Sequence, residues 1–145
     1  MIQENKKLLL KDLLPRQLYG VKAHYQYYDF VGGSERLIQE DDGVIESIDL
    51  SLGNPIYIDG HHVELENIKP YLRPMSSMTD MEKIELCVRG YAPDYVSESL
   101  AEKLYVIRTN AENAADFYNE YHFDYRGLIE KGLALEAPEG MYEKI

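Results

Sequence analysis

Residues 56–65 carry the strongest structural signal in the chain, because apolar residues alternate on both sides of Asp59-Gly60. An Asp-Gly pair suits a two-residue type I′ turn, in which both positions need positive φ. This turn predicts a β-hairpin with the cross-strand pairs Ile58–His61, Tyr57–His62 and Ile56–Val63. The buried face of the hairpin then holds Ile56, Ile58, Val63 and Leu65, and the opposite face holds Tyr57, His62 and Glu64.

Two further strands are predicted before this hairpin. Residues 19–27 alternate with period two, which is typical of a strand with one buried and one solvated face. The expected buried face there consists of Tyr19, Val21, Ala23, Tyr25 and Tyr27. A second strand is expected over residues 44–50, with Val44, Ile48 and Leu50 pointing inward. The residues between the two strands, from Gly32 to Gly43, are expected to form a polar loop, and a short segment over residues 67–72 ends the block.

Helices are predicted at both ends of the chain. Leucines at helical spacing indicate a helix over residues 4–14, which Pro15 closes. Thr79 and Glu82 fit a capping box, so a second helix is expected over residues 79–88. A further helix is expected after Ser97 or Ser99, with Leu100, Leu104 and Ile107 on one stripe. The stretch led by Asn110 either continues that helix or forms its own, with Ala111, Ala114, Ala115 and Tyr118 on one face. A turn at Leu128-Ile129, capped by Gly132, and an extended segment over residues 133–137 complete the tail.

These elements predict an α+β fold. Three or four short antiparallel strands within about 60 residues do not bury two faces as a flat sheet, so we expect a small SH3-like barrel or a strongly curled sheet, with the first helix over one opening. An open sheet backed by helices is the alternative. The barrel with its N-terminal helix is assigned to residues 1–78, and the helical segment with a docked tail to residues 79–145, within one compact unit.

The charge of the chain argues against two classes of partner. Its 145 residues include 26 Asp and Glu but only 15 Lys and Arg, which gives a net charge of -11. The excess of carboxylates is present in both halves of the chain, and binding to nucleic acid or to anionic membranes needs clustered cations. We therefore expect a protein partner rather than nucleic acid or a membrane. An alternative is an acidic inhibitor that mimics nucleic acid, for which Glu40-Asp41-Asp42 is the longest acidic run.

The location expected from the sequence is the cytoplasm. Cys87 is the single cysteine, so it forms no intramolecular disulfide, and it lies in an apolar helical stretch where an inert thiol is expected. No N-terminal signal is evident, and no apolar run approaches the ~20 residues of a membrane span.

No catalytic, metal or cofactor residue is assigned from the sequence. The four histidines show no zinc-ligand spacing, and His62-Val63-Glu64 lacks the P-C-x-x-C partner of the deaminase signature. Pro93-Asp94 resembles the start of a nuclease motif, but Ala101 stands where that motif needs a carboxylate. The remaining enzymatic alternative is a site in which His24 or His62 meets two carboxylates in a concave pocket.

The candidate contact residues lie in two groups. One is the outer face of the predicted barrel, with Lys22, His24, Tyr57 and His62. The other is the aromatic stretch near the C-terminus, with Tyr121, Tyr125 and Arg126, because Tyr and Arg concentrate binding energy at interfaces. Packing is the alternative role for these aromatic rings.

Two segments also carry a resemblance. They are IKPYLRPMSSMT at residues 68–79 and HFDYRGLIEKGLALEAP at residues 122–138. Together with residues 8–25, they resemble a family of small uncharacterised proteins of gut anaerobes that is associated with prophages and other mobile elements. The resemblance implies a cytoplasmic accessory role and no established activity or cofactor. The sequence thus favours a non-catalytic interaction or regulatory module of mobile-element type.

Overall fold

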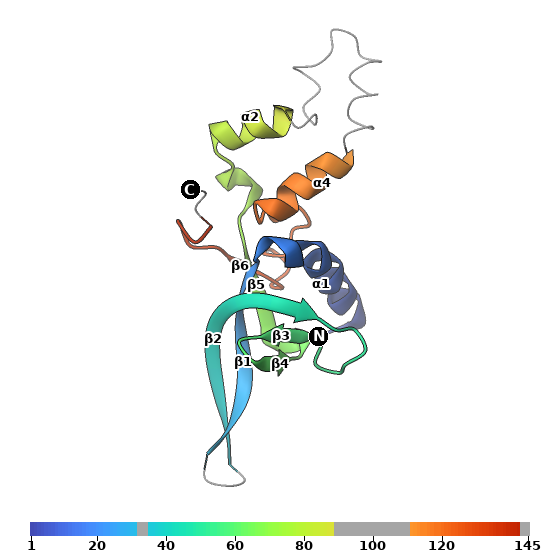
Figure 1. Ribbon diagram of the computed structural model, residues 1–145, viewed down its shortest axis with the longest axis vertical. Coiled ribbons are helices and arrows are strands. Elements are labelled where there is room, and N and C mark those ends of the chain that lie inside the picture. Colours follow the sequence, from blue (N-terminus) through green and yellow to red (C-terminus); the bar gives the residue numbers. More distant parts are fainter. Residues whose placement is uncertain (32–34, 89–110, 143–145) are drawn as a thin grey trace.

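The computed structural model describes residues 1–31, 35–88 and 111–142. In these residues the chain forms an α+β fold with an N-terminal helix (Figure 1). The helices are α1 (Gln3–Arg16), α2 (Asp80–Val88) and α4 (Ala111–Glu120), with the short 3₁₀ turns η1 (Gln17–Tyr19), η2 (Leu65–Asn67) and η3 (Met75–Ser77). The strands are β1 (Lys22–Val31), β2 (Glu35–Ile48), β3 (Ile56–Ile58), β4 (His61–Val63), β5 (Ile68–Leu72) and β6 (Leu135–Glu136).

The strands form one mixed sheet in the order β4-β3-β2-β1-β5-β6. All neighbouring strands are antiparallel except β5 and β6, which are parallel. The sheet is unclosed, so the SH3-like barrel expected from the sequence is not confirmed, and the fold corresponds to the alternative of an open sheet with helices. The additional strand β6 comes from the C-terminal tail, which brings residues 135–136 beside residues 71–72 of β5.

The hairpin at Asp59-Gly60 is confirmed in its register. Ile58 pairs with His61, Tyr57 with His62, and Ile56 with Val63. Asp59 and Gly60 have φ values of 50° and 82°, as a type I′ turn requires. The predicted apolar face of this hairpin is buried, because it faces the core below the sheet.

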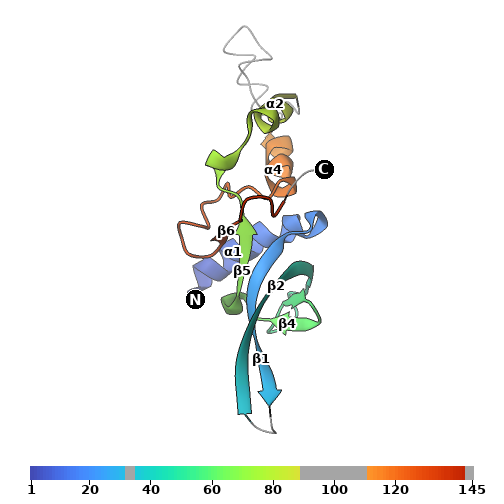
Figure 2. The same ribbon diagram turned by 90° about the vertical axis from the view of Figure 1, so that its left-hand side faces the viewer.

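The expected polar loop after Gly32 was wrong over its described part. Residues 35–43 belong to β2, which pairs with β1 over ten positions, from Lys22 opposite Val44 to Val31 opposite Glu35. The two strands form a ribbon that projects beyond the rest of the fold (Figures 1 and 2). Polar residues are compatible with a strand here because residues 37–42 of β2 are exposed or only partly buried on both faces, so their polar composition does not indicate a loop.

The inward face predicted for the second strand was wrong at two of its three positions, whereas Ile48 packs against the core as predicted. Ile45 is buried, whereas Val44 and Leu50 are exposed. The pairing of β2 with β3 shifts register between Ile45 and Ser47. Such an irregularity changes the simple alternation of side chains, which a period-two pattern from sequence assumes.

The main core lies between α1 and the sheet. Leu9 and Leu13 of α1 pack with strand residues of one sheet face, including Ala23, Tyr25 and Ile58. Pro15 lies in the last turn of α1 rather than after it, so the helix runs slightly further than predicted. From the C-terminal tail, Leu128, Leu133 and Ala134 complete this core.

A second, smaller cluster joins α2 and α4. It consists of Leu86, Ala114, Phe117, Tyr121 and Phe123. The predicted capping box is confirmed, because the Glu82 N–H donates to the Thr79 hydroxyl (3.2 Å) and the Thr79 N–H donates to the Glu82 carboxylate (3.0 Å). The helix expected after Ser97 or Ser99, Asn110 and the side chain of Cys87 lie outside the described residues.

Candidate binding groove

A groove of about 930 Å³ lies between α2 and the C-terminal end of the chain. One wall is α2, the other is residues 136–142, which we call the C-terminal arm, and the segment from Arg73 to Thr79 lies at its base. Tyr121, at the end of α4, also lines it. The groove is thus built by segments that are far apart in the sequence.

The α2 wall presents apolar side chains to solvent. Met81 and Ile84 are 74% and 56% exposed, and they follow each other at i and i+3 on one side of the helix. Glu85, one position further, also lines the groove and accepts a hydrogen bond from the Tyr121 hydroxyl at 2.6 and 2.7 Å to its two oxygens. The capping box determines where α2 begins, and therefore which of its residues lie on the groove side.

Arg73 fixes the position of α2 relative to the sheet. Its guanidinium donates two hydrogen bonds to the Glu82 carboxylate, at 2.5 and 2.7 Å, and a third to the Ser77 carbonyl at 3.1 Å. It also stacks over the Phe123 ring, 4.2 Å from the centroid. The hydrogen bonds from Arg73 lower the pKa of Glu82 to about 2, so this ion pair persists in all but strong acid.

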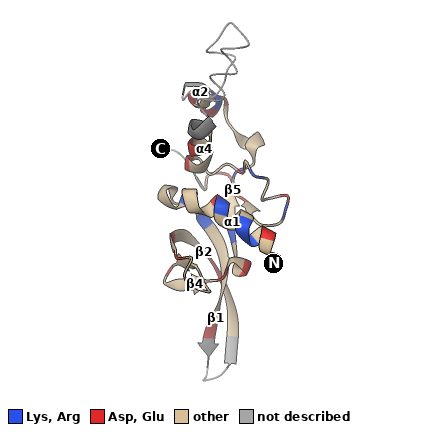
Figure 3. Ribbon diagram, turned by 90° about the vertical axis from the view of Figure 1, so that its right-hand side faces the viewer, with Lys and Arg blue, Asp and Glu red and all other residues tan. Residues whose placement is uncertain are grey.

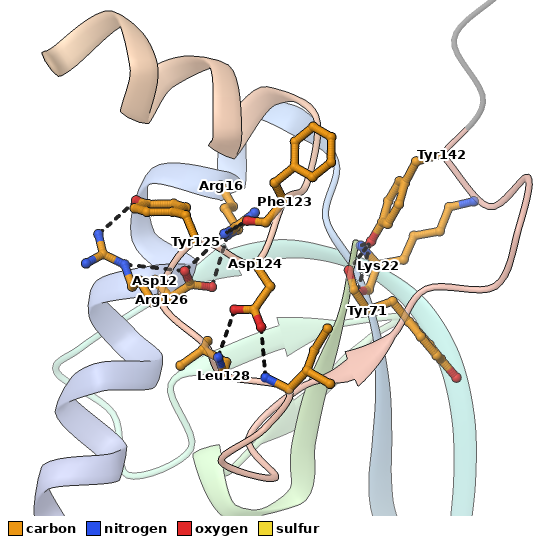
Figure 4. Close-up of polar contacts among 11 residues, drawn as sticks. Asp12, Arg16, Lys22, Tyr71, Phe123, Asp124, Tyr125, Arg126, Leu128 and Tyr142 are labelled. Atoms are coloured by element: carbon orange, nitrogen blue, oxygen red, sulfur yellow. Dashed lines mark hydrogen bonds and ion pairs between the residues drawn. The ribbon is translucent and has the colours of Figure 1, made fainter. Parts of the chain in front are cut away.

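The C-terminal arm is held by backbone pairing and by one tyrosine. β6 pairs with β5, and the Ala137 N–H continues this ladder by donating to the Leu72 carbonyl at 2.8 Å. The Tyr142 hydroxyl accepts a hydrogen bond from the Lys22 N–H and donates one to the Tyr71 carbonyl, both at 2.8 Å (Figure 4). The Lys22 ammonium adds a hydrogen bond to the Met141 carbonyl at 3.3 Å. These contacts anchor the arm at the start of β1.

His122 links the end of α4 to this anchor. Its N–H donates to the Asn119 carbonyl, and the Phe123 N–H donates to the Tyr118 carbonyl, which is the pattern of a Schellman motif. His122 occupies the left-handed position of that motif with φ of 63°, where glycine is usual. Its ring stacks on Tyr142, with centroids 3.8 Å apart. Burial and the nearby cations Arg16, Arg73 and Lys22 lower the pKa of His122 to about 4.

A buried polar network lies between α1 and the loop that follows α4. The Arg16 guanidinium donates to both oxygens of Asp12, at 3.0 and 3.1 Å, and to the Phe123 carbonyl at 2.6 Å (Figure 4). Arg126 forms an ion pair with Asp12 at 3.4 Å and donates to the Tyr125 hydroxyl at 2.9 Å. Burial raises the pKa of the Asp12 carboxyl, and the adjacent Arg16 opposes that rise.

Asp124 orders the next turn of the same loop. Its carboxylate accepts hydrogen bonds from the Leu128 and Ile129 N–H groups at 2.8 and 3.0 Å (Figure 4). Together, Asp12, Arg16 and Asp124 hold residues 122–129 against α1. Because Arg73 accepts and donates backbone bonds with this loop, the buried network also positions the base of the groove.

The seven contact residues predicted from the sequence fall in different places. Tyr121 lines the groove and Lys22 anchors the arm. Tyr125 and Arg126 belong to the buried network instead, although both retain partial exposure. The structure therefore divides the predicted C-terminal group between the groove and the contact with α1.

The other predicted residues lie on the outer sheet face, in two separate positions. Tyr57 and His62 contact each other across the hairpin, with ring centroids 4.9 Å apart. His24 lies opposite Asp42 of β2, whereas Tyr57 lies opposite Ser47. Asp42 and Ser47 are five residues apart on β2, which corresponds to about 16 Å along a strand. The sheet does not bring these side chains into one site.

His24 contacts two carboxylates on the open face of the ribbon. Its ring nitrogens lie 2.9 Å from an Asp42 oxygen and 3.5 Å from a Glu40 oxygen. Burial works to lower the pKa of His24, but the hydrogen bonds to Asp42 and Glu40 outweigh it and raise this pKa. These three residues line neither the groove nor the smaller cavity near η2, in contrast to the concave pocket expected for an enzyme. Among the residues that the structure describes, no group of three or more His, Cys, Asp or Glu side chains has the arrangement of a metal site.

Sequence reasoning missed Met81, Ile84 and Arg73 as groove residues. Part of this arrangement could have been predicted, because the capping box and the i, i+3 spacing place Met81 and Ile84 on one side of α2. Nothing local in the sequence shows that this side faces the C-terminal arm. That arrangement depends on the parallel pairing of β5 with β6.

The charges along the groove are predominantly negative. Glu85, Glu136 and Glu139 line it, and its cation Arg73 is paired with Glu82. Lys and Arg are instead prominent on α1 (Figure 3). A cationic ligand is therefore favoured in the groove over an anionic one.

Comparisons with protein-family models, with curated proteins and with solved structures found no match to this chain. Within the described residues, no helix has both the length and the apolar character needed to cross a membrane.

Proposed function

We propose that the protein is a non-catalytic interaction module whose groove binds an apolar, basic segment of another protein. The observation that carries this proposal is the exposure of Met81 and Ile84 on a groove wall that faces an acidic arm. We place this activity in the cytoplasm, in agreement with the single cysteine and with the resemblance to proteins of mobile elements.

Hydrophobic burial supplies the driving force in this proposal. Covering Met81 and Ile84 removes two large apolar side chains from water, and each fully buried side chain of this size contributes roughly 1.5–3 kcal/mol. Met suits such a surface because its flexible thioether adapts to different apolar partners. The groove volume of about 930 Å³ is in the range of cavities that take several side chains of a ligand.

The acidic residues supply selectivity. Glu136 and Glu139 lie on the arm, so a Lys or Arg next to the apolar residues of a ligand meets opposite charge there. Exposed charge pairs add little affinity but accelerate association and disfavour acidic competitors. Binding is therefore expected to weaken as the salt concentration rises.

A displayed library of random peptides of about a dozen residues tests the proposal without knowledge of the natural partner. We expect enriched peptides to combine apolar residues with Lys or Arg, and we expect the double variant Met81→Glu, Ile84→Glu to lower their affinity by about tenfold or more, measured by fluorescence anisotropy. Leu18→Glu is the matched control, because Leu18 is highly exposed but does not line the groove.

Enrichment of acidic peptides would contradict the proposed selectivity. Basic apolar peptides that bind the double variant as tightly as the wild-type protein would show that the groove is not their binding site. Reversing the charge of the arm with Glu136→Lys and Glu139→Lys gives a second readout, for which we expect weaker binding and a reduced salt dependence.

A further inference from the structure

The β1–β2 ribbon has two long edges that lack a neighbouring strand in the described part of the chain. On one side, β5 pairs with β1 only over residues 23–25. On the other side, β3 pairs with β2 only from Ile45 onward. Beyond these points the ribbon projects away from the helices and from the rest of the sheet (Figures 1 and 2).

The register determines which backbone groups point outward from each edge. The Ile45 N–H donates to the Val21 carbonyl, so alternate residues from this pair onward direct their backbone groups between the strands. The intervening residues direct theirs away from the ribbon. On β1 these include Gln26, Tyr28 and Phe30, and on β2 they include Ile38, Glu40 and Asp42.

The two edges differ in their protection against pairing. The β2 edge carries Glu40, Asp41 and Asp42, and the Asp41 carboxylate accepts a hydrogen bond from the outward N–H of Asp42 at 2.8 Å. Charges and local caps of this kind discourage strand addition. Residues 26–31 of β1 contain no Lys, Pro or Gly, and Asp29 is their one charged residue.

We propose that two copies of this chain pair through their β1 edges as antiparallel strands. A twofold axis at Tyr28 places Tyr28 opposite its own copy, Gln26 opposite Phe30, and Tyr27 opposite Asp29. This register joins outward backbone groups to outward backbone groups, as an isologous interface requires. It also keeps the Asp29 carboxylates of the two copies from lying directly opposite each other.

The occupant is a second copy of this acidic chain because the β1 edge is the less acidic of the two: residues 26–31 carry a net charge of -1, whereas residues 35–44 of β2 carry -3. Two chains with a net charge of -11 repel each other, and the β2 edge would add Glu40, Asp41 and Asp42 to that repulsion. A basic peptide, in contrast, would favour the β2 edge. Tyr28 and its cross-strand neighbour Ile38 are 53% and 59% exposed, so the pairing also brings the apolar pairs of the two copies together on one face of a four-stranded ribbon.

Sedimentation equilibrium up to a protein concentration of about 500 µM tests this inference, since a dimer with a Kd of ~100 µM is well populated there. We expect a dimer whose Kd decreases as salt is added, because salt screens the repulsion between the two chains. Tyr28→Pro removes an outward N–H from the β1 edge, and Ile38→Pro is its matched control on the β2 edge. We expect a Kd at least about tenfold higher for Tyr28→Pro and an unchanged Kd for Ile38→Pro.

A second pair of variants covers the outcome in which proline disrupts the ribbon itself. Tyr28→Asp places two carboxylates face to face at the proposed axis, whereas Ile38→Asp adds the same charge to the other strand. A dimer that is weakened more by Tyr28→Asp supports the inference. A wild-type chain that remains monomeric at about 500 µM overturns it. So does a dimer that is weakened equally by both members of each pair, or more by the β2 variants.

Discussion

Two clusters in this protein pair basic side chains with carboxylates, and they differ chiefly in their burial. Asp12 lies between Arg16 and Arg126, and the side chains of Asp12 and Arg16 are fully buried. His24 lies between Glu40 and Asp42 on the ribbon, where both carboxylates are more than half exposed. The ion pairs of the two clusters therefore contribute differently to stability, because water competes with the exposed pairs and not with the buried one.

The comparison explains how the predicted contact residues are used. Tyr125 and Arg126 contact the buried cluster, where they help to hold the loop after α4 against α1. Exposed apolar side chains on α2, which take part in neither cluster, are the better candidates for binding. Variants of the two clusters test this division.

The largest effect is expected for Arg16→Met. This change keeps the apolar stem of the side chain but leaves Asp12 buried without its main partner and the Phe123 carbonyl without its donor. Removal of one member of a buried ion pair typically costs about 3–5 kcal/mol. Urea unfolding measures this loss, and a loss below about 1 kcal/mol would show that the buried cluster does not hold the loop.

A pH effect of intermediate size is expected from His122, which lies beside the buried cluster. Its pKa in the folded protein is about 4, below the ordinary value of 6.5, so the unfolded chain binds the additional proton between these values. The free energy of unfolding should therefore be highest above pH 6.5 and fall as the pH drops toward 4, by as much as about 3 kcal/mol from this group.

The variant His122→Asn isolates that contribution, because Asn tolerates the left-handed conformation but does not titrate. We expect the wild-type protein to lose stability relative to the variant as the pH falls from 6.5 to 4. The unfolding free energy of the wild type minus that of the variant should therefore decrease over this range. A difference that stays constant across this range would show that His122 has the same pKa in both states.

The smallest effect is expected for His24→Ala in the exposed cluster. Ion pairs at solvent-exposed positions contribute about 0–1 kcal/mol, so the urea midpoint should change little and the change should be smaller at high salt. A loss above about 2 kcal/mol in unfolding free energy would show that the exposed cluster stabilises the fold as strongly as a buried one, which would contradict the comparison.

Local patterns predicted the elements whose structure depends on neighbouring residues. The turn at Asp59-Gly60 and the capping box of Thr79 and Glu82 were both confirmed, because their hydrogen bonds and φ values are set within four residues. The β2 half of the ribbon over residues 35–43 was not predicted, since its polar composition is also typical of a loop. The inward position of Ile45 depends on an irregular pairing with β3 that no periodic pattern contains.

The groove could not be predicted from local sequence patterns, because it also depends on contacts between distant segments. Its arm is positioned by pairing between residues 71–72 and 135–136 and by the contact of Tyr142 with Lys22, across more than 60 and more than 100 residues of chain respectively. The sequence predicted Tyr121 as a contact residue. It did not indicate that α2 and the C-terminal arm form the two walls of a groove next to Tyr121.

The central claim is that Met81 and Ile84 serve binding rather than stability, and the most direct test measures both properties in one variant. For Met81→Glu, Ile84→Glu, we expect the affinity for selected basic apolar peptides to fall by about tenfold or more. We expect the free energy of unfolding to remain within about 0.5 kcal/mol of the wild-type value, as for other exposed positions. Unchanged peptide affinity together with a loss of more than about 2 kcal/mol in unfolding free energy would contradict the claim, because it would identify these side chains as part of the folded core.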